Sequence, residues 1–204
     1  MREEPPREGE PTHVILDSAG VDLLELVRLG ALPDRALQRY LANDTAVLLC
    51  DEENTPLSEL SADGVTHLRP LAAGVGTAWS SALRQPVATA ARHAGPTVAL
   101  VAHLPPSNAE LDALAVRVTD IGATRLLLCA LVSRAPAPDG EVQPSGLIRA
   151  LTSAAEDMRR SLPTCQITLL VLPWPKGELN PEDLARAYGA TEIVVGAERY
   201  AATA

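Results

Sequence analysis

The chain has 204 residues and a mass of 21.5 kDa, and 47% of its residues are hydrophobic, which is enough for one domain or two small ones and excludes a disordered chain. The formal net charge of −9 opposes binding to nucleic acid or to an anionic membrane. The three cysteines are far apart, which fits neither a disulfide framework nor a zinc site and indicates a reducing, cytoplasmic location.

The first part of the sequence has a mixed pattern. Residues 1–11 are charged and rich in proline, lack the apolar core of a signal peptide, and are expected to form a disordered arm. Residues 12–95 are expected to form a first domain, with its boundary near Gly95-Pro96. Its predicted elements are a strand at His13–Leu16, a helix from Val21 to Leu29 that ends at Gly30, a strand at Ala46–Cys50, and short strands around Leu57, Leu60, Val65 and Leu68. Residues 72–94 have weak periodicity and carry no assignment.

Residues 96–204 alternate regularly between apolar strands and amphipathic helices. The predicted strands are Thr97–Ala102, Arg125–Val132, Ile167–Leu172 and Glu192–Val195, and the predicted helices are Asn108–Ile121, Ser145–Arg160 and a short one that Asn180 and Pro181 open and Gly189 ends. Continuous apolar strands that alternate with helices predict an α/β domain whose parallel sheet is covered on both faces.

Ligands of such sheets bind beyond the carboxyl ends of the strands. This rule directs attention to the segments His103–Glu110, Ser133–Pro144, Pro173–Gly177 and Gly196–Tyr200. The sequence contains no Walker A motif, no dinucleotide fingerprint after the first long strand and no GxSxG elbow, and its four histidines lack metal-ligand spacing. No cofactor or metal is therefore expected, and no catalytic residue is assigned.

Three features of these segments have both a functional and a plain structural interpretation. His103 is the one histidine at a strand's carboxyl end, and it either contacts a ligand or is an ordinary loop residue. Trp174, between two prolines, either stacks on a base or covers apolar surface, with packing favoured. Glu110 and Asp112, at a helix start, are interpreted as carboxylates that compensate the helix dipole rather than as general bases.

Six segments, in order, resemble the sulfate adenylyltransferase (ATP sulfurylase) family. They are Leu16–Leu32, Asp51–Leu60, Thr97–Leu111, Ile121–Ser133, Ile167–Pro175 and Ala187–Tyr200. The resemblance implies a PUA-like domain for residues 12–95 and a Rossmann-like domain of the nucleotidyltransferase type for residues 96–204. It also implies a place in sulfate assimilation, where that family forms adenylyl sulfate and pyrophosphate from ATP and sulfate.

The residues that carry the family's chemistry are replaced in this sequence. Its two motif histidines correspond to Ser107 and Glu110, and its Gln-Thr-Arg-Asn segment ends here at His103-Leu104. The vestigial nucleotide-site positions implied by the resemblance are His103, Ser107, Glu110, Lys176, Gly196, Glu198 and Arg199. A carboxylate in place of a histidine repels a polyphosphate, so any binding of ATP or adenylyl sulfate is expected to be weak.

These replacements predict a pseudoenzyme: a degenerate module with a structural, regulatory or partner-binding role. It is expected to self-associate or to accompany an adenylyl-sulfate kinase. Two alternatives stay open. One is an active nucleotidyltransferase with a rearranged site around His103, Lys176 and Arg199, and the other is a small-molecule-binding Rossmann-like domain unrelated to sulfate.

Overall fold

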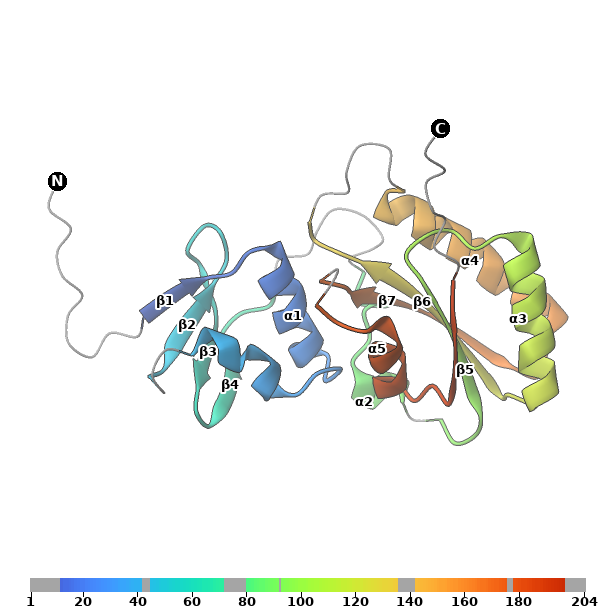
Figure 1. Cartoon of the computed structure of the whole chain (residues 1–204), viewed down its shortest axis with the longest axis horizontal. Coiled ribbons are helices and arrows are strands. Elements are labelled where there is room, and N and C mark those ends of the chain that lie inside the picture. The colour runs from blue at the N-terminus through green and yellow to red at the C-terminus, as the bar shows by residue number, and fades with distance from the viewer. Residues whose placement is uncertain are drawn as a thin grey trace, which may run out of the picture.

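The computed structural model describes residues 12–41, 45–71, 80–91, 93–135, 142–175 and 178–196. Each half of the described chain is built around its own four-stranded sheet (Figure 1). The second sheet is entirely parallel and is flanked by helices, which confirms the α/β class predicted from the sequence. The arm predicted at residues 1–11 lies outside the described residues.

The first sheet has the order β1-β2-β3-β4. Strand β1 runs parallel to β2, and the other two pairs are antiparallel. The elements of this half are β1 (Thr12–Ile15), α1 (Ser18–Arg28), the 3-10 helix η1 (Asp34–Tyr40), β2 (Val47–Cys50), β3 (Pro56–Ser61) and β4 (Gly64–His67). Their apolar side chains enclose one core, to which α1 contributes Leu23, Leu24 and Val27.

The parallel sheet has the order β7-β6-β5-β8. Its strands are β5 (Thr97–Ala102), β6 (Arg125–Val132), β7 (Gln166–Pro173) and β8 (Glu192–Val195). The helices of this half are α2 (Val87–Ala90), α3 (Asn108–Ile121), α4 (Pro144–Ser161) and α5 (Pro181–Ala187). Every residue of β5 and β6 is buried, as expected for central strands with a helical layer on each face.

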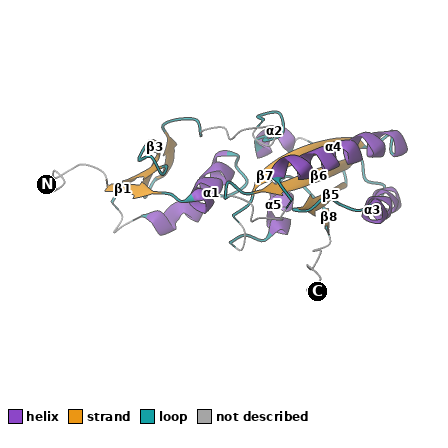
Figure 2. Ribbon diagram, turned by 90° about the horizontal axis from the view of Figure 1, so that it is seen from above, coloured by secondary structure: helices purple, strands orange, loops and turns teal. Residues whose placement is uncertain are grey.

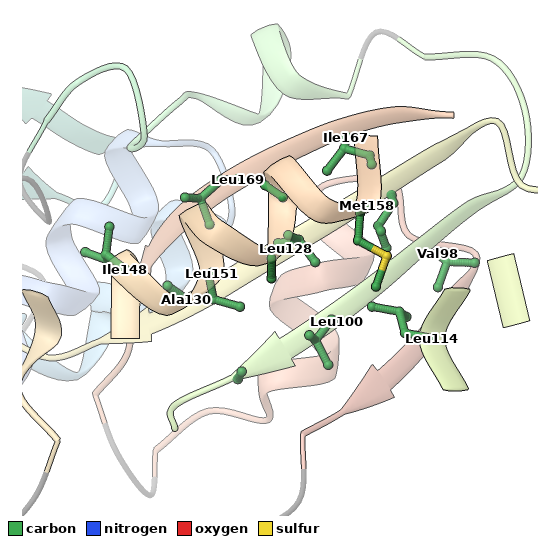
Figure 3. Close-up of a cluster of buried hydrophobic side chains, with 14 of the residues drawn as sticks. Val98, Leu100, Leu114, Leu128, Ala130, Ile148, Leu151, Met158, Ile167 and Leu169 are labelled. Carbon is green, nitrogen blue, oxygen red and sulfur yellow. The ribbon is translucent and has the colours of Figure 1, made fainter. Parts of the chain in front are cut away.

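Helices α3 and α4 cover one face of the parallel sheet (Figure 2). Leu114 of α3 and Leu151 and Met158 of α4 pack against side chains of the central strands, such as Leu100 and Leu128 (Figure 3). The spacing of these helix residues is the one that predicted the two helices from the sequence, because residues three, four and seven apart share a helix face.

Helix α1 of the first half contributes to the other face of the parallel sheet, together with α2 and α5. Leu26 is fully buried in a cluster that includes Leu127 and Leu170 of the sheet and Tyr188 after α5. Leu24, two residues earlier on α1, is fully buried in the core of the first half. A single helix therefore contributes side chains to both cores and couples the two sheets.

The two edges of the parallel sheet differ. On the β7 side, the N–H of Val171 donates to the carbonyl of Leu83 at 2.9 Å, so the segment before α2 covers part of that edge. On the β8 side, no strand among the described residues pairs with the outer edge. Strand β8 thus presents backbone donors and acceptors that its own sheet does not use.

Two short helices, η1 and α2, were not predicted from the sequence. Helix η1 has only seven residues and α2 only four, so neither is long enough to establish a helical period. Within the described part of the chain, no helix is both long enough and apolar enough to cross a membrane.

Replacing Leu26 with alanine tests the shared role of α1. We expect the free energy of unfolding to fall by about 2–5 kcal/mol, because the substitution leaves a cavity beneath the parallel sheet. Urea unfolding followed by circular dichroism measures this loss. Val116→Ala, at a 60% exposed position on α3, is the control and should change stability by less than about 0.5 kcal/mol. A loss below about 1 kcal/mol for Leu26→Ala would show that α1 does not support the parallel sheet.

Candidate functional site

The carboxyl ends of the parallel strands meet at one edge of the sheet, which we call the carboxyl edge. The described residues that follow the strands there are His103 after β5, Ser133 after β6, Trp174 after β7 and Gly196 after β8. This is the place where parallel α/β sheets bind their ligands. What these loops contact therefore decides what the edge can bind.

His103 and Trp174 lie together at this edge, although β6 separates their strands. Their ring centroids are 5.4 Å apart with an angle of 40° between the planes. The backbone N–H of Trp174 donates to the carbonyl of Val132 at 3.1 Å, which fixes the loop over the end of β6. The indole Nε1 is enclosed and has no hydrogen-bond partner among the described residues. Trp174 also packs against the apolar cluster beneath it, the packing role that its sequence context favoured.

Ser107 and Glu110 bond to each other at the start of α3. The Ser107 N–H and hydroxyl donate to Glu110 Oε2 at 2.7 and 2.6 Å, and the Glu110 N–H donates to Ser107 Oγ at 3.3 Å. This capping box uses backbone N–H groups that a helix start otherwise offers to an anion. The Glu110 carboxylate also places a negative charge there, in line with the dipole-compensating role expected for it.

Of the remaining predicted positions, Gly196 is the one that the structure describes. The Gly196 N–H donates to the carbonyl of Val101 at 2.9 Å, and a Cβ at Gly196 would lie 3.5 Å from that of Ala102. Lys176, Glu198 and Arg199 lie outside the described residues. Among the described residues, no group of three or more His, Cys, Asp or Glu side chains could hold a metal ion.

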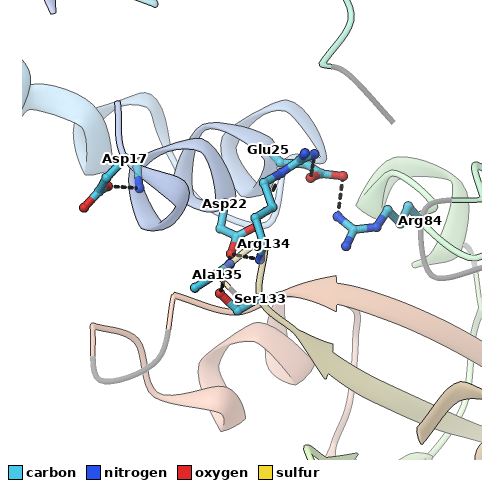
Figure 4. A network of polar contacts seen from close by, with 8 residues as sticks. Asp17, Asp22, Glu25, Arg84, Ser133, Arg134 and Ala135 are labelled. Carbon is cyan, nitrogen blue, oxygen red and sulfur yellow. Dashed lines mark hydrogen bonds and ion pairs between the residues drawn. The ribbon is translucent and has the colours of Figure 1, made fainter. Parts of the chain in front are cut away.

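The loop after β6 is held by carboxylates of α1 (Figure 4). Asp22 Oδ2 accepts hydrogen bonds from the Arg134 backbone N–H at 2.9 Å and from the Ser133 hydroxyl at 3.1 Å. The Arg134 guanidinium lies 3.5 Å from Asp22 Oδ1 through Nε and 2.7 Å from Glu25 Oε2 through Nη2. One arginine thus contacts two carboxylates that are one helical turn apart.

A second arginine completes this group of charges. Arg84 Nη1 lies 2.6 Å from Glu25 Oε1, so Glu25 bridges Arg84 and Arg134. The side chain of Asp22 has no exposed surface, and those of Arg84 and Glu25 are 5% and 12% exposed. We call Asp22, Glu25, Arg84, Ser133 and Arg134 the buried charge cluster.

Burial is the main influence on the protonation of Asp22. It raises the pKa of the Asp22 carboxyl from 3.8 to about 6, because the ionised form loses its hydration. The hydrogen bonds from Arg134 and Ser133, and the positive charges of Arg134 and Arg84, oppose this change without cancelling it. The charge of Asp22 therefore changes in mildly acidic solution.

The sequence analysis did not identify Asp22, Glu25 or Arg84 as site residues. A signal is present in the segment Val21–Val27, VDLLELV. Its apolar run is interrupted by Asp22 and Glu25, which are three residues apart. Such acids lie on one side of a helix whose other sides are also buried, so each requires a partner. The partner Arg134 is more than a hundred residues away, and its position depends on the fold.

Comparison with known proteins finds similarity to solved structures but no relative by sequence. No family model matches the sequence, and no curated protein matches it. Among solved structures, the hexameric APS kinase from Thiobacillus denitrificans superposes with a TM-score of 0.61 at 17% sequence identity. The match covers 90% of this chain and 47% of the kinase chain, so this chain spans about half the length of that protein. At this identity the similarity establishes the shared fold.

These comparisons correct the family assignment made from the sequence. The sulfate adenylyltransferase assignment is wrong, because no sequence family supports it and the structural relative is an APS kinase, a different enzyme. The function derived from that resemblance, a degenerate member of the ATP sulfurylase family, is withdrawn with it. The six resembling segments consist largely of strand and helix patterns, which report a fold class rather than a chemistry.

The altered pKa of Asp22 predicts a specific pH dependence. A carboxyl whose pKa is higher in the folded state stabilises the fold below its unfolded pKa, and this stabilisation is lost as the pH rises through the folded value. We therefore expect the free energy of unfolding of the unmodified protein, minus that of Asp22→Asn, to increase by up to about 3 kcal/mol as the pH falls from 7 to 4.

Urea unfolding of both proteins across this pH range measures the difference, in which the contributions of other carboxyls cancel. Glu182→Gln, at an exposed ion pair on α5, is the control and should give a difference of less than about 0.5 kcal/mol. A difference for Asp22→Asn that does not vary with pH would contradict the assignment.

Proposed function

We propose that this chain acts by association with copies of itself and that its carboxyl edge is not open to phosphorylated ligands. The observation that carries the proposal is that, among the described residues of the carboxyl edge, two groups that could bind an anion are already bonded to the chain's own carboxylates. Asp22 and Glu25 bind Arg134 after β6, and Glu110 caps the start of α3. An enzyme that acts on phosphorylated substrates needs such groups to be available to the substrate.

A phosphate group would have to compete with these internal contacts. Hydrogen bonds to charged groups contribute about 1.5–3 kcal/mol each, and separating a buried ion pair leaves two uncompensated charges. A polyphosphate would also approach a chain with a net charge of −9. Nucleotide chemistry at this edge is therefore disfavoured by the same contacts that hold the loops in place.

The outer edge of β8 supports association between copies. The N–H of Gly196 donates to β5, so by the alternation of a parallel ladder the N–H and carbonyl of Val195 point away from β5. The Val195 side chain is 48% exposed. A second β8, antiparallel to the first, would pair with these groups and extend the sheet across two molecules.

The structural relative also supports self-association, since it is described as hexameric. Because this chain spans about half of that protein, the kinase activity in its name is not transferred to this chain.

Two further predictions stay with the proposal. One is that residues 12–95 form a PUA-like domain, and the other is that the protein is cytoplasmic, as the scattered free thiols Cys50, Cys129 and Cys165 indicate.

Sedimentation equilibrium of the full chain tests association through β8. We expect a species larger than the 21.5 kDa monomer, and we expect Val195→Pro to weaken association about tenfold or more. Proline removes the outward N–H and cannot pair within a continuous sheet. Val195→Thr keeps the N–H and a β-branched side chain, so it is the matched control and should still associate. A monomeric unmodified chain at high micromolar concentration would rule out the proposal.

Nucleotide binding without catalysis is the second candidate, because the structural relative is a kinase and an aromatic pair lies at the carboxyl edge. The aromatic contact of His103 with Trp174 suits a planar base better than a phosphate. Calorimetric titration with ATP and with adenosine separates the two candidates.

Under the leading proposal neither compound binds with a dissociation constant below about 1 mM. Micromolar binding of adenosine that Trp174→Leu abolishes and Val116→Leu leaves unchanged would favour the second candidate instead.

A further inference from the structure

Arg125, the first residue of β6, is a buried residue whose cation has no partner among the described residues. It is 3% exposed and lies where the parallel strands begin, opposite their carboxyl ends. We call this end of the sheet the amino edge. The Arg125 Nε is enclosed without a hydrogen bond, and the guanidinium makes no hydrogen bond or ion pair among the described residues. Burial lowers the pKa of Arg125, and among the described residues the Cys129 thiol is the one ionisable group that opposes this change.

This situation is unusual because buried arginines are almost always paired. Removing a charge from water costs several kcal/mol, which is normally offset by an opposite charge or a full set of hydrogen bonds. The chain carries 26 acidic residues against 17 lysines and arginines, yet none of the described carboxylates reaches Arg125. Arg84 and Arg134, by contrast, each have a carboxylate partner in the buried charge cluster.

The neighbours of Arg125 on the adjacent strands are polar and uncharged. Side chains two residues apart on a strand share a face, so Arg125 leaves β6 on the same face as Leu127 and Cys129. Thr97 of β5 and Gln166 of β7 are its partners in register on either side. They lie on that same face, since Ala99 and Leu170 of their strands do so. A hydroxyl and a carboxamide thus flank Arg125 in the sheet. The Thr97 hydroxyl donates to the carbonyl of Gly95 at 3.4 Å, so the Gln166 amide is the donor that can serve a ligand.

We propose that Arg125 is the centre of a binding site for a small oxyanion at the amino edge of the parallel sheet. The planar guanidinium presents parallel N–H donors that match two oxygens of one anion, and the Gln166 amide can donate to a third. The slight exposure of Arg125 admits a small anion of the size of phosphate or sulfate rather than a nucleotide. This site is separate from the carboxyl edge and does not depend on the proposed association through β8.

Binding of inorganic phosphate to the full chain tests this site. Thermal unfolding is followed in a chloride-free buffer as the phosphate concentration rises, and the stabilisation is fitted to a saturable and a linear part. The linear part reports the general stabilisation that phosphate gives to any protein. We expect a saturable part in the unmodified chain and its loss, a weakening of about tenfold or more, in Arg125→Met.

Two further variants keep the experiment decisive. Arg149→Met removes one positive charge from an exposed position on α4 and should leave the saturable part unchanged. Arg125→Lys retains the charge without the paired donors, so it should bind phosphate more weakly than the unmodified chain but more tightly than Arg125→Met. Arg125→Met should also be at least as stable as the unmodified chain without phosphate, since it replaces an unpaired buried cation with an apolar side chain.

The remaining outcomes overturn the proposal. A purely linear response of the unmodified chain would do so even if Arg125→Met failed to fold, as would equal saturable responses of the unmodified chain and Arg125→Met. If Arg125→Met instead abolished self-association in sedimentation and phosphate had no saturable effect, the partner of Arg125 would be a carboxylate of a second copy and not a free oxyanion.

Discussion

The ion pairs between α1 and the loop after β6 fix the position of the first half of the molecule relative to the parallel sheet. Asp22 and Glu25 lie one turn apart on a helix that is buried on nearly all sides, and they meet Arg134 directly after a central strand of the parallel sheet. Their charges have little access to water, so they are stable in this position only with the arginines in place. The requirement fixes the rotation of α1 about its axis. With that rotation, Leu26 reaches the parallel sheet and Leu24 reaches the first core.

The same contacts restrict what the molecule can do. In many α/β proteins the loops after the strands are free to bind a substrate, but here one such loop is bonded to the neighbouring half of the chain. The start of α3 is likewise occupied by Glu110. The described part of the carboxyl edge is therefore built mainly from internal contacts, whereas Arg125, at the amino edge, makes no hydrogen bond or ion pair among the described residues. Arg84 and Arg134 pair with Glu25, which indicates a structural role, whereas Arg125 pairs with no described carboxylate, which makes it the candidate for binding.

Local patterns predicted the parallel half of the fold well. The strands at 97–102, 125–132 and 192–195 and the helix at 108–121 have the predicted bounds, because apolar runs and capping residues act over short distances. The contact between His103 and Trp174 and the cluster around Asp22 were not predicted. Each depends on which strands become neighbours, and the order β7-β6-β5-β8 is not encoded in any single segment. The assignment to the sulfate adenylyltransferase family was wrong for a related reason. It relied on segments whose residues pack the core, and core patterns are shared by proteins with different functions.

The order of the strands also has a consequence for how the chain folds. Strand β8 pairs with β5, the first strand of the parallel sheet, and Thr191 closes this pairing by hydrogen bonds to Thr97 across 94 residues. Contacts between residues so distant in sequence carry a large loop-closure entropy and are associated with slow folding. Until β8 is in place, β5 is an exposed edge whose residues are apolar on both faces. During synthesis, β5 to β7 therefore leave the ribosome before the strand that protects them, and this interval is the stage at which the chain is most exposed to aggregation.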